Sequence, residues 1–181
     1  MNLFYRKVKF FSLSALVALA FQATTMLPVF ADEFKNKAKA VMLYKFFQYV
    51  TWPGTKSFSD SEEARFCYHG KNSFLHILNY IKNKKKSGPQ FSIKEISLFD
   101  RAESCHLMFI SKLDDSALQF LHRESLPILT VSDQMNFFEN GGMIALYFEG
   151  DRLQLEVNKT KLSQAGLKIS TKLLRIAKNI R

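Results

Sequence analysis

The chain has 181 residues, of which 47% are hydrophobic, 14% aromatic and 23% charged. This composition excludes a disordered or low-complexity protein and provides enough apolar residues for one ordinary core. The formal net charge of +10 would by itself suggest a nucleic acid or an anionic membrane as partner. The N-terminal residues change that interpretation.

Residues 1–31 have the pattern of a secretory signal peptide. Arg6, Lys7 and Lys9 form a basic start, and an apolar stretch runs from Phe10 to Phe21. The pattern closes on Val29-Phe30-Ala31, so we predict cleavage after Ala31 and export to the periplasm. The apolar stretch is too short and too interrupted for a membrane anchor. Residues 32–181 would then act away from genomic DNA and carry a charge of +7, so we expect no nucleic-acid partner.

The first half of the mature chain alternates strands with helices. Residues 34–50 predict a helix that is apolar around most of its circumference, and therefore packed on more than one side. Thr51-Trp52-Pro53-Gly54 ends that helix. The elements predicted next are a strand over 64–69, a helix over 73–83, a basic loop over 82–88, strands over 90–97 and 106–110, a helix over 114–123 and a strand over 127–132.

The pattern changes after Gly141-Gly142. Strands over 143–149 and 152–158 flank Gly150-Asp151, which is a strong hairpin signal. Asn158 is expected to cap a short helix that ends at Gly166. A last helix is predicted over 170–180, with Leu173, Ile176, Ala177 and Ile180 on one face and Lys168, Lys172, Arg175 and Lys178 on the other. Two interpretations of these four basic residues remain open: plain solvation, or contact with an acidic or lipid surface.

Two continuous apolar runs, at 107–110 and 128–131, are typical of strands covered on both faces. Together with the hairpin they predict an α/β fold: a single-domain sandwich with a mixed parallel and antiparallel sheet flanked by helices, ending in a β-hairpin and then a helix. No linker or repeat interrupts residues 32–181, which we take as one domain.

Cys67 and Cys105 are the two cysteines of the chain. An even pair in an oxidising compartment usually forms a disulfide, and two buried free thiols are the alternative. The chain contains no C-x-x-C motif, which excludes a thioredoxin-type redox site.

The sequence lacks several familiar catalytic motifs. The four histidines form no H-E-x-x-H motif, and neither G-x-S-x-G nor S-x-x-K occurs. Strand alternation places Cys67 and His69 on one face, which would suit a metal or a Cys–His pair, but the disulfide competes for the thiol. Ser132-Asp133 ends an apolar strand, where α/β folds often place functional groups; capping of the next turn is the structural alternative. We therefore predict no catalytic, cofactor or metal site and no enzyme activity.

One ordered series of segments is more specific than these motifs. It comprises Leu129-Thr130-Val131-Ser132-Asp133, Gly141-Gly142-Met143-Ile144, Leu155-Glu156-Val157-Asn158 and residues 165–174. Earlier pieces agree, namely the helix through Tyr44 and Phe46-Phe47 that closes on Trp52-Pro53, and the run from Cys105 to Ser111. In this series the chain resembles the YfiR family of bacterial periplasmic regulators, over nearly all of residues 32–181.

This resemblance implies binding and not catalysis. It implies a periplasmic negative regulator that represses an inner-membrane diguanylate cyclase of the YfiN type by engaging its periplasmic sensor domain. Cyclic-di-GMP and biofilm formation then fall. An OmpA-like outer-membrane lipoprotein of the YfiB type would sequester the repressor. The resemblance also implies homodimers, and related domains occur beside sensor kinases. A small-molecule-binding module or a sensor-kinase accessory module is the alternative function.

The chain departs from the best-known members of that family in its cysteines. Those members carry a second pair near the Gly-Gly segment, whereas positions 132–150 contain none here. For the partner surface, the segment Asp133–Gly142 offers the apolar side chains of Met135, Phe137 and Phe138 as candidate anchors. The alternative is that these aromatic side chains fold back over the sheet edge.

Overall fold

The structure, a computed structural model, describes residues 27–54, 58, 63–84, 88–96, 102–123 and 126–181. The chain divides into two units, residues 1–35 and residues 36–181. Of the first unit, the described part is the beginning of helix α2 (Leu27–Tyr49). Most of the predicted signal peptide and part of the predicted basic loop therefore lie outside the described residues. No helix in the described part of the chain is long and apolar enough to cross a membrane.

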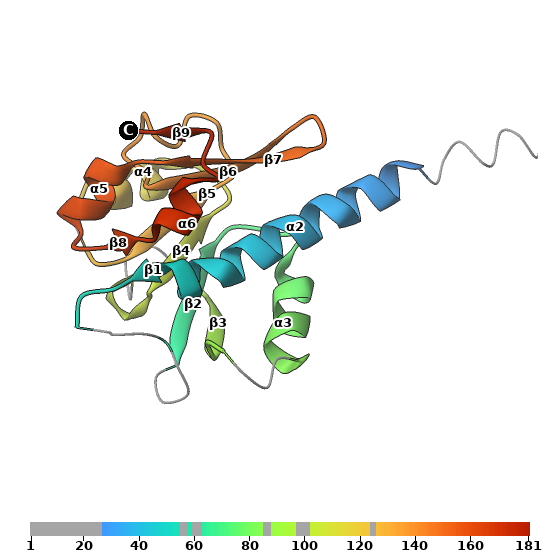
Figure 1. Cartoon of the computed structure of the whole chain (residues 1–181), viewed down its shortest axis with the longest axis horizontal. Helices are drawn as coiled ribbons and strands as arrows, with labels where there is room; N and C mark the ends of the chain where they lie inside the picture. The colour runs from blue at the N-terminus through green and yellow to red at the C-terminus, as the bar shows by residue number, and fades with distance from the viewer. Residues whose placement is uncertain (1–26, 55–57, 59–62, 85–87, 97–101, 124–125) are drawn as a thin grey trace, which may run out of the picture. The chain divides into compact units, whose positions relative to one another are not determined.

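The second unit is built on a seven-stranded sheet (Figure 1), whose strand order is β3-β2-β4-β5-β6-β7-β9. The first five of these strands run parallel, β6 and β7 form an antiparallel hairpin, and β9 adds to β7 in parallel. The strand bounds are β2 (Ala64–His69), β3 (Phe91–Glu95), β4 (Leu107–Ile110), β5 (Leu129–Ser132), β6 (Ile144–Glu149), β7 (Arg152–Val157) and β9 (Asn179–Ile180). The mixed sheet confirms the predicted fold class.

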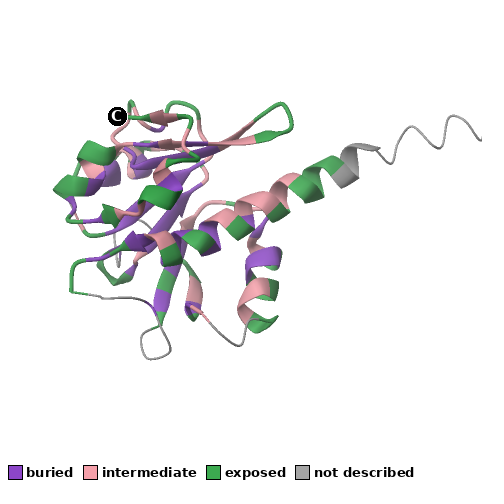
Figure 2. Ribbon diagram, in the orientation of Figure 1, coloured by how far each residue is buried: buried purple, intermediate pink, exposed green. Residues whose placement is uncertain are grey.

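Helices cover both faces of the sheet, and the side chains of β4 and β5 show why. Every residue of these two strands is buried (Figure 2), and alternate residues enter two separate cores. Leu107 and Phe109 pack with α2, α3 (Leu75–Lys84), α5 (Lys159–Gln164) and α6 (Thr171–Leu174). Met108 and Ile110 pack on the other face with α4 (Asp115–Leu121) and the 3-10 turn η1 (Ala102–Ser104). The continuous apolar runs thus mark strands buried on both sides.

Polar side chains define several element ends. The carboxylate of Asp114 accepts the Ala117 N–H at the start of α4, and the Asn158 side chain accepts the Lys161 N–H at the start of α5. Ser170 caps α6 in the same way through the Leu173 N–H. The Asn158 cap and the hairpin at Gly150-Asp151, where Glu149 pairs with Arg152, are both as predicted.

The last helix is much shorter than the prediction of residues 170–180. Helix α6 ends at Leu174, and the chain then turns and forms β9. The reason is the unpaired edge of β7: the Lys178 N–H donates to the Leu155 carbonyl and the Arg181 N–H to the Val157 carbonyl. These sheet bonds replace the helical ones. Ile176 and Ile180 are accordingly exposed and do not complete a buried helix stripe.

A second, two-stranded sheet was not predicted. Strand β1 (Val50–Thr51) pairs antiparallel with β8 (Lys168–Ile169), and the Ser170 N–H donates to the Tyr49 carbonyl. The end of α2 is thereby tied to the start of α6, more than a hundred residues later in the chain. Strands of two residues are too short to show alternation, so only the tertiary structure reveals them.

Candidate functional site

The sheet has a topological switch point between β2 and β4. From β2 the chain crosses through α3 to β3 on one side, whereas from β4 it crosses through α4 to β5 on the other side. The two helices lie on opposite faces of the sheet. In open parallel sheets the loops that leave the carboxyl ends of strands at such a point are the usual place for binding. The residues that follow β2, β4 and β5 are therefore the candidate site.

A histidine–aspartate pair joins the end of β2 to the start of α4. The Nε2 atom of His69 lies 3.1 Å from Oδ2 of Asp114. The other carboxylate oxygen accepts the Ser116 hydroxyl at 2.6 Å and the Ala117 N–H at 3.1 Å. These hydrogen bonds from Ser116, His69 and Ala117 hold the pKa of Asp114 well below its usual range. Asp114 is therefore an ionised cap and a positioning group for His69.

Gly70 allows the loops after β2 and β4 to approach closely. Its φ is +85°, and a Cβ atom at this position would lie 2.3 Å from Oγ of Ser111. The Ser111 hydroxyl donates to the His69 carbonyl at 2.8 Å, and the Ser111 N–H donates to the same oxygen at 3.1 Å. These two hydrogen bonds to the His69 carbonyl hold the two loops together, and one of them uses the Ser111 hydroxyl.

The turn after β5 is anchored in three places. Ser132 is fully buried; its hydroxyl donates to the Ile110 carbonyl at 2.6 Å and accepts the Gln134 N–H at 3.1 Å. The Gln134 side chain donates to the Ser111 carbonyl at 3.1 Å. Asp133 accepts a charged hydrogen bond from Nζ of Lys39 on α2 at 2.6 Å. Ser132 and Asp133 thus fix the start of the next segment, which is the structural interpretation considered from the sequence.

The apolar residues of the segment Asp133–Gly142 differ in how far they are exposed. Met135 is 83% exposed. Phe137 is fully buried in the core that contains α4, and Phe138 is partly buried against the same core. Phe137 also explains Gly142, because a Cβ atom there would lie 2.2 Å from the Phe137 ring. Phe137 was a candidate anchor from the sequence; its burial corrects that assignment to a core role. Met135 remains exposed on a fixed turn.

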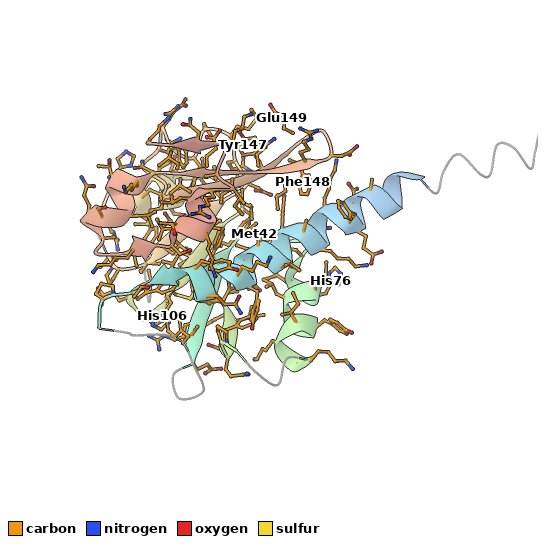
Figure 3. The ribbon with its side chains drawn as sticks, in the orientation of Figure 1. Met42, His76, His106, Tyr147, Phe148 and Glu149 are labelled. Atoms are coloured by element: carbon orange, nitrogen blue, oxygen red, sulfur yellow. A yellow bond between two sulfur atoms is a disulfide. The ribbon has the colours of Figure 1, made fainter. Side chains whose placement is uncertain are left out.

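His106 lies at the opposite end of the strands (Figure 3), and two aromatic rings are close to it. Its ring is 4.6 Å from the Phe58 ring and 6.1 Å from the Trp52 ring, and its carbonyl accepts the Trp52 indole N–H. Nδ1 accepts the backbone N–H of Arg65 at 3.0 Å. Burial, with a smaller contribution from the Arg65 guanidinium, lowers the pKa of His106 to about 4. The ring is thus a neutral structural acceptor.

Cys67 and Cys105 form a disulfide, with 5.9 Å between their Cα atoms. Cys67 lies on β2, and Cys105 lies between η1 and β4; both are almost completely buried. The bridge ties the connection that enters β4 to the neighbouring strand. It also uses the thiol that a Cys67–His69 pair would need, so that alternative does not apply.

The polar side chains described above hold loops and strand ends in place. The hydroxyls of Ser111 and Ser132 bond backbone groups, the two cysteines bond each other, and the partly buried His106 ring accepts a backbone N–H. Among the described residues, no group of three or more His, Cys, Asp or Glu side chains could hold a metal ion. Sequence reasoning missed the His69–Asp114 pair and the Lys39–Asp133 pair, which join residues 45 and 94 positions apart.

These features define a single α/β sandwich domain whose loops at the carboxyl edge of the sheet are rigidly held and present an exposed side chain. The family profile described as YfiR/HmsC-like matches residues 36–178. The chain therefore belongs to the YfiR/HmsC-like family, as its sequence series predicted. Membership supports a periplasmic regulator of cyclic-di-GMP signalling in general terms and a non-catalytic role.

One solved structure agrees with the fold. The crystal structure of a conserved domain protein from Vibrio cholerae O1 biovar El Tor is similar with a TM-score of 0.52 and 12% sequence identity. The similarity covers 81% of this chain and 60% of that one, so the chain spans about three fifths of the length of that structure. At this identity the likeness shows the fold alone. No curated protein matches the chain.

Proposed function

We propose that the protein is an exported repressor that binds the periplasmic sensor domain of an inner-membrane diguanylate cyclase. Family membership over residues 36–178 is the observation that carries this proposal. Repression of this kind needs a stable domain with an exposed, fixed contact and no turnover. An OmpA-like lipoprotein that competes for the repressor, and association into homodimers, belong to the same proposal.

Export is the first part of the proposal. Helix α2 extends back to Leu27, so the cleavage site after Ala31 lies within its first turns. Cleavage there would leave Asp32 and Glu33 as the first residues of the helix. Two carboxylates at a helix N-terminus interact favourably with the helix dipole, which supports a mature chain that starts at Asp32. Intact-mass measurement of protein recovered from the periplasm tests this: the expected product begins at Asp32, and an uncleaved chain contradicts it.

The contact is the second part, and we assign it to Met135 and its turn. Apolar side chains that protrude from a rigid support are effective anchors in protein interfaces, because little conformational entropy is lost on binding. Met135 has this setting: it is 83% exposed, and the residues before it are anchored through Ser132, Asp133 and Gln134. Phe138, three residues later and partly buried against the α4-side core, is assigned to the flank of the contact.

Binding to the purified sensor domains of the cell's own diguanylate cyclases tests this contact. The wild-type protein is expected to bind one of them, and Met135→Ser is expected to weaken the affinity at least roughly tenfold, as for an anchor of about 1.4 kcal/mol or more. Tyr80→Ser is the matched control, because Tyr80 is 62% exposed on α3 and far from this turn in sequence. Equal affinities for the two variants would refute the assigned contact. Absence of binding to every sensor domain would refute the repressor itself.

A second candidate function has one specific observation in its favour. A cleft on the α4 side of the sheet is lined by the apolar side chains of Phe120, Leu121 and Ile128, and by Thr130, Arg123 and Lys161. Such a cleft suits a small anion with an apolar body. The test is a thermal-shift series with short aliphatic and aromatic carboxylates, because a ligand present at 100 times its Kd stabilises by about 2.7 kcal/mol. A flat series contradicts this alternative.

A further inference from the structure

Charge is strongly segregated between segments of the chain. Residues 36–54 and 157–181 contain ten basic residues and no aspartate or glutamate. These are Lys37, Lys39, Lys45, Lys159, Lys161, Lys168, Lys172, Arg175, Lys178 and Arg181. The described acidic residues lie at the start of α2 (Asp32 and Glu33), in η1, in α4, and in other strands and loops. At the average frequency of the chain, 16 acidic residues in 181, these 44 residues would contain about four.

The fold brings these two segments together. Strand β1 pairs with β8, and the Ser170 N–H donates to the Tyr49 carbonyl, so the end of α2 lies beside the start of α6. Both helices and the β1–β8 pair are on the same side of the large sheet (Figure 1). Lys45 on α2, Lys168 on β8 and Lys172 on α6 are all exposed. Their ammonium groups therefore form one cationic surface.

Several basic residues of the two segments, Lys37 among them, have partners of their own. Lys39 bonds Asp133, Lys178 bonds Glu149 at 2.8 Å, and Arg181 lies over the Phe138 ring. Two exposed aliphatic side chains lie close in sequence to basic residues of α2 and α6. Val41 is 42% exposed on α2, one turn before Lys45, and Ile176 is 58% exposed just after α6. We call Val41, Lys45, Lys168, Lys172, Arg175 and Ile176 the basic face.

We infer that the basic face docks the domain onto an anionic phospholipid surface. Basic residues near such a surface are attracted to its negative potential, and aliphatic side chains among them enter the headgroup region. A surface that carries positive charges and isolated aliphatic side chains can make both of these interactions with a membrane. Specific protein interfaces instead depend on a packed apolar centre with matched hydrogen bonds. A second copy of the chain is a poor occupant, because a two-fold contact would place like charges opposite each other.

This surface is separate from the proposed partner contact. Met135 follows β5 at the carboxyl edge of the sheet, whereas the basic face is formed by α2, α6 and the β1–β8 pair. A domain that lies on the bilayer through one surface keeps the other available. Membrane docking would concentrate the protein in the layer where a membrane-embedded partner is found.

Vesicle sedimentation of the exported protein tests the inference without any cyclase, so its outcome is independent of the repressor proposal. The triple variant Lys45→Glu, Lys168→Glu, Lys172→Glu removes three cations of the basic face. The matched control, Lys94→Glu, Lys112→Glu, Arg152→Glu, makes the same change in net charge on β3, before α4 and on β7. Lys94 and Arg152 alternate with residues of the α2-side core and so face the opposite side. Circular dichroism establishes that both variants are folded.

We expect the wild type and the control variant to sediment with vesicles of phosphatidylethanolamine and phosphatidylglycerol, but not with vesicles of phosphatidylethanolamine and phosphatidylcholine. A basic residue near an anionic surface contributes roughly fivefold to partitioning, so the triple variant should bind about 100-fold more weakly. Salt at about 0.5 M should release the protein. Ile176→Ser should weaken binding roughly tenfold, and Ile180→Ser, at an exposed isoleucine of β9, should not.

Three results would overturn the inference. The first is no binding of the wild type to the anionic vesicles. The second is an equal loss in the two triple variants, which would mean that net charge alone governs binding. The third is equal binding to both kinds of vesicle. If the basic-face variant instead lost affinity for a sensor domain while the wild type ignored vesicles, the face would be a protein interface and the lipid assignment would be wrong.

Discussion

Protonation of His106 should destabilise the fold in a defined pH range. In the native state Nδ1 accepts the Arg65 N–H at 3.0 Å, and Nε2 lies 3.5 Å from Nη2 of the Arg65 guanidinium. An imidazolium at this place would lose its acceptor role and face another cation. Burial and Arg65 accordingly lower the pKa of His106 from 6.5 to about 4. The native state therefore binds fewer protons than the unfolded state between these two values.

This difference in bound protons sets the sign and the size of the change in stability with pH. The stabilisation is fully present above the unfolded pKa of about 6.5 and is lost as the pH falls toward about 4. At about 1.4 kcal/mol per pKa unit, linkage gives a loss of up to about 2 kcal/mol between about pH 7 and pH 5. Because the His106 side chain is partly exposed, screening by water makes this an upper figure. Asp114, whose pKa is depressed, loses its contribution only at lower pH.

Urea unfolding of the wild type and of His106→Asn at both pH values measures this loss. The asparagine Oδ1 atom can accept the Arg65 N–H in place of Nδ1 but does not titrate. The wild type should lose up to about 2 kcal/mol more than the variant when the pH is lowered, with equal m-values in the two proteins. Equal pH dependence in the two proteins would refute the reasoning, because it would mean that His106 is not held neutral by its surroundings.

Three further predictions follow from the core and the carboxyl edge. Replacing Cys67 and Cys105 together by serine should lower the free energy of unfolding by about 4 kcal/mol, because the bridge closes a loop of 38 residues; a non-reducing denaturation curve unchanged by the double substitution would contradict it. Phe137→Ala should cost roughly 3–5 kcal/mol, since the ring is fully buried, and a cost below about 1 kcal/mol would show that Phe137 does not pack in the core. Ser132→Ala should cost about 1–3 kcal/mol, because it strips the partner from the Ile110 carbonyl and the Gln134 N–H; a thermal melt that matches the wild type would disprove this role.

The fold class could be predicted because its signals are local. Two short apolar runs identified β4 and β5, and Gly150-Asp151 identified the β6–β7 hairpin. The last helix was overestimated because its apolar spacing continues to Ile180, while the competing sheet bonds to β7 come from a strand more than twenty residues away. Local periodicity contains no information about that vacant edge.

The candidate site could be predicted less well from the sequence, because it also depends on contacts between residues that are distant in the chain. Alternation in the sequence located Ser132-Asp133 at a strand end, but only the parallel register brings His69 beside Asp114, and only the packing of α2 brings Lys39 to Asp133. Within the segment Asp133–Gly142, spacing could not distinguish Phe137, which is buried, from Met135, which is exposed. The distinction depends on a ring that packs against Gly142, a contact that no pattern of hydrophobicity records.

The central claim is repression of a diguanylate cyclase by the exported protein through the Met135 turn. Cellular cyclic-di-GMP tests it most directly, measured in the parent strain, in a strain that lacks the gene, and after re-expression of the exported wild type or of Met135→Ser. We predict a rise on deletion that the wild type reverses and that Met135→Ser, at equal periplasmic level, does not. Unchanged cyclic-di-GMP on deletion would contradict the account.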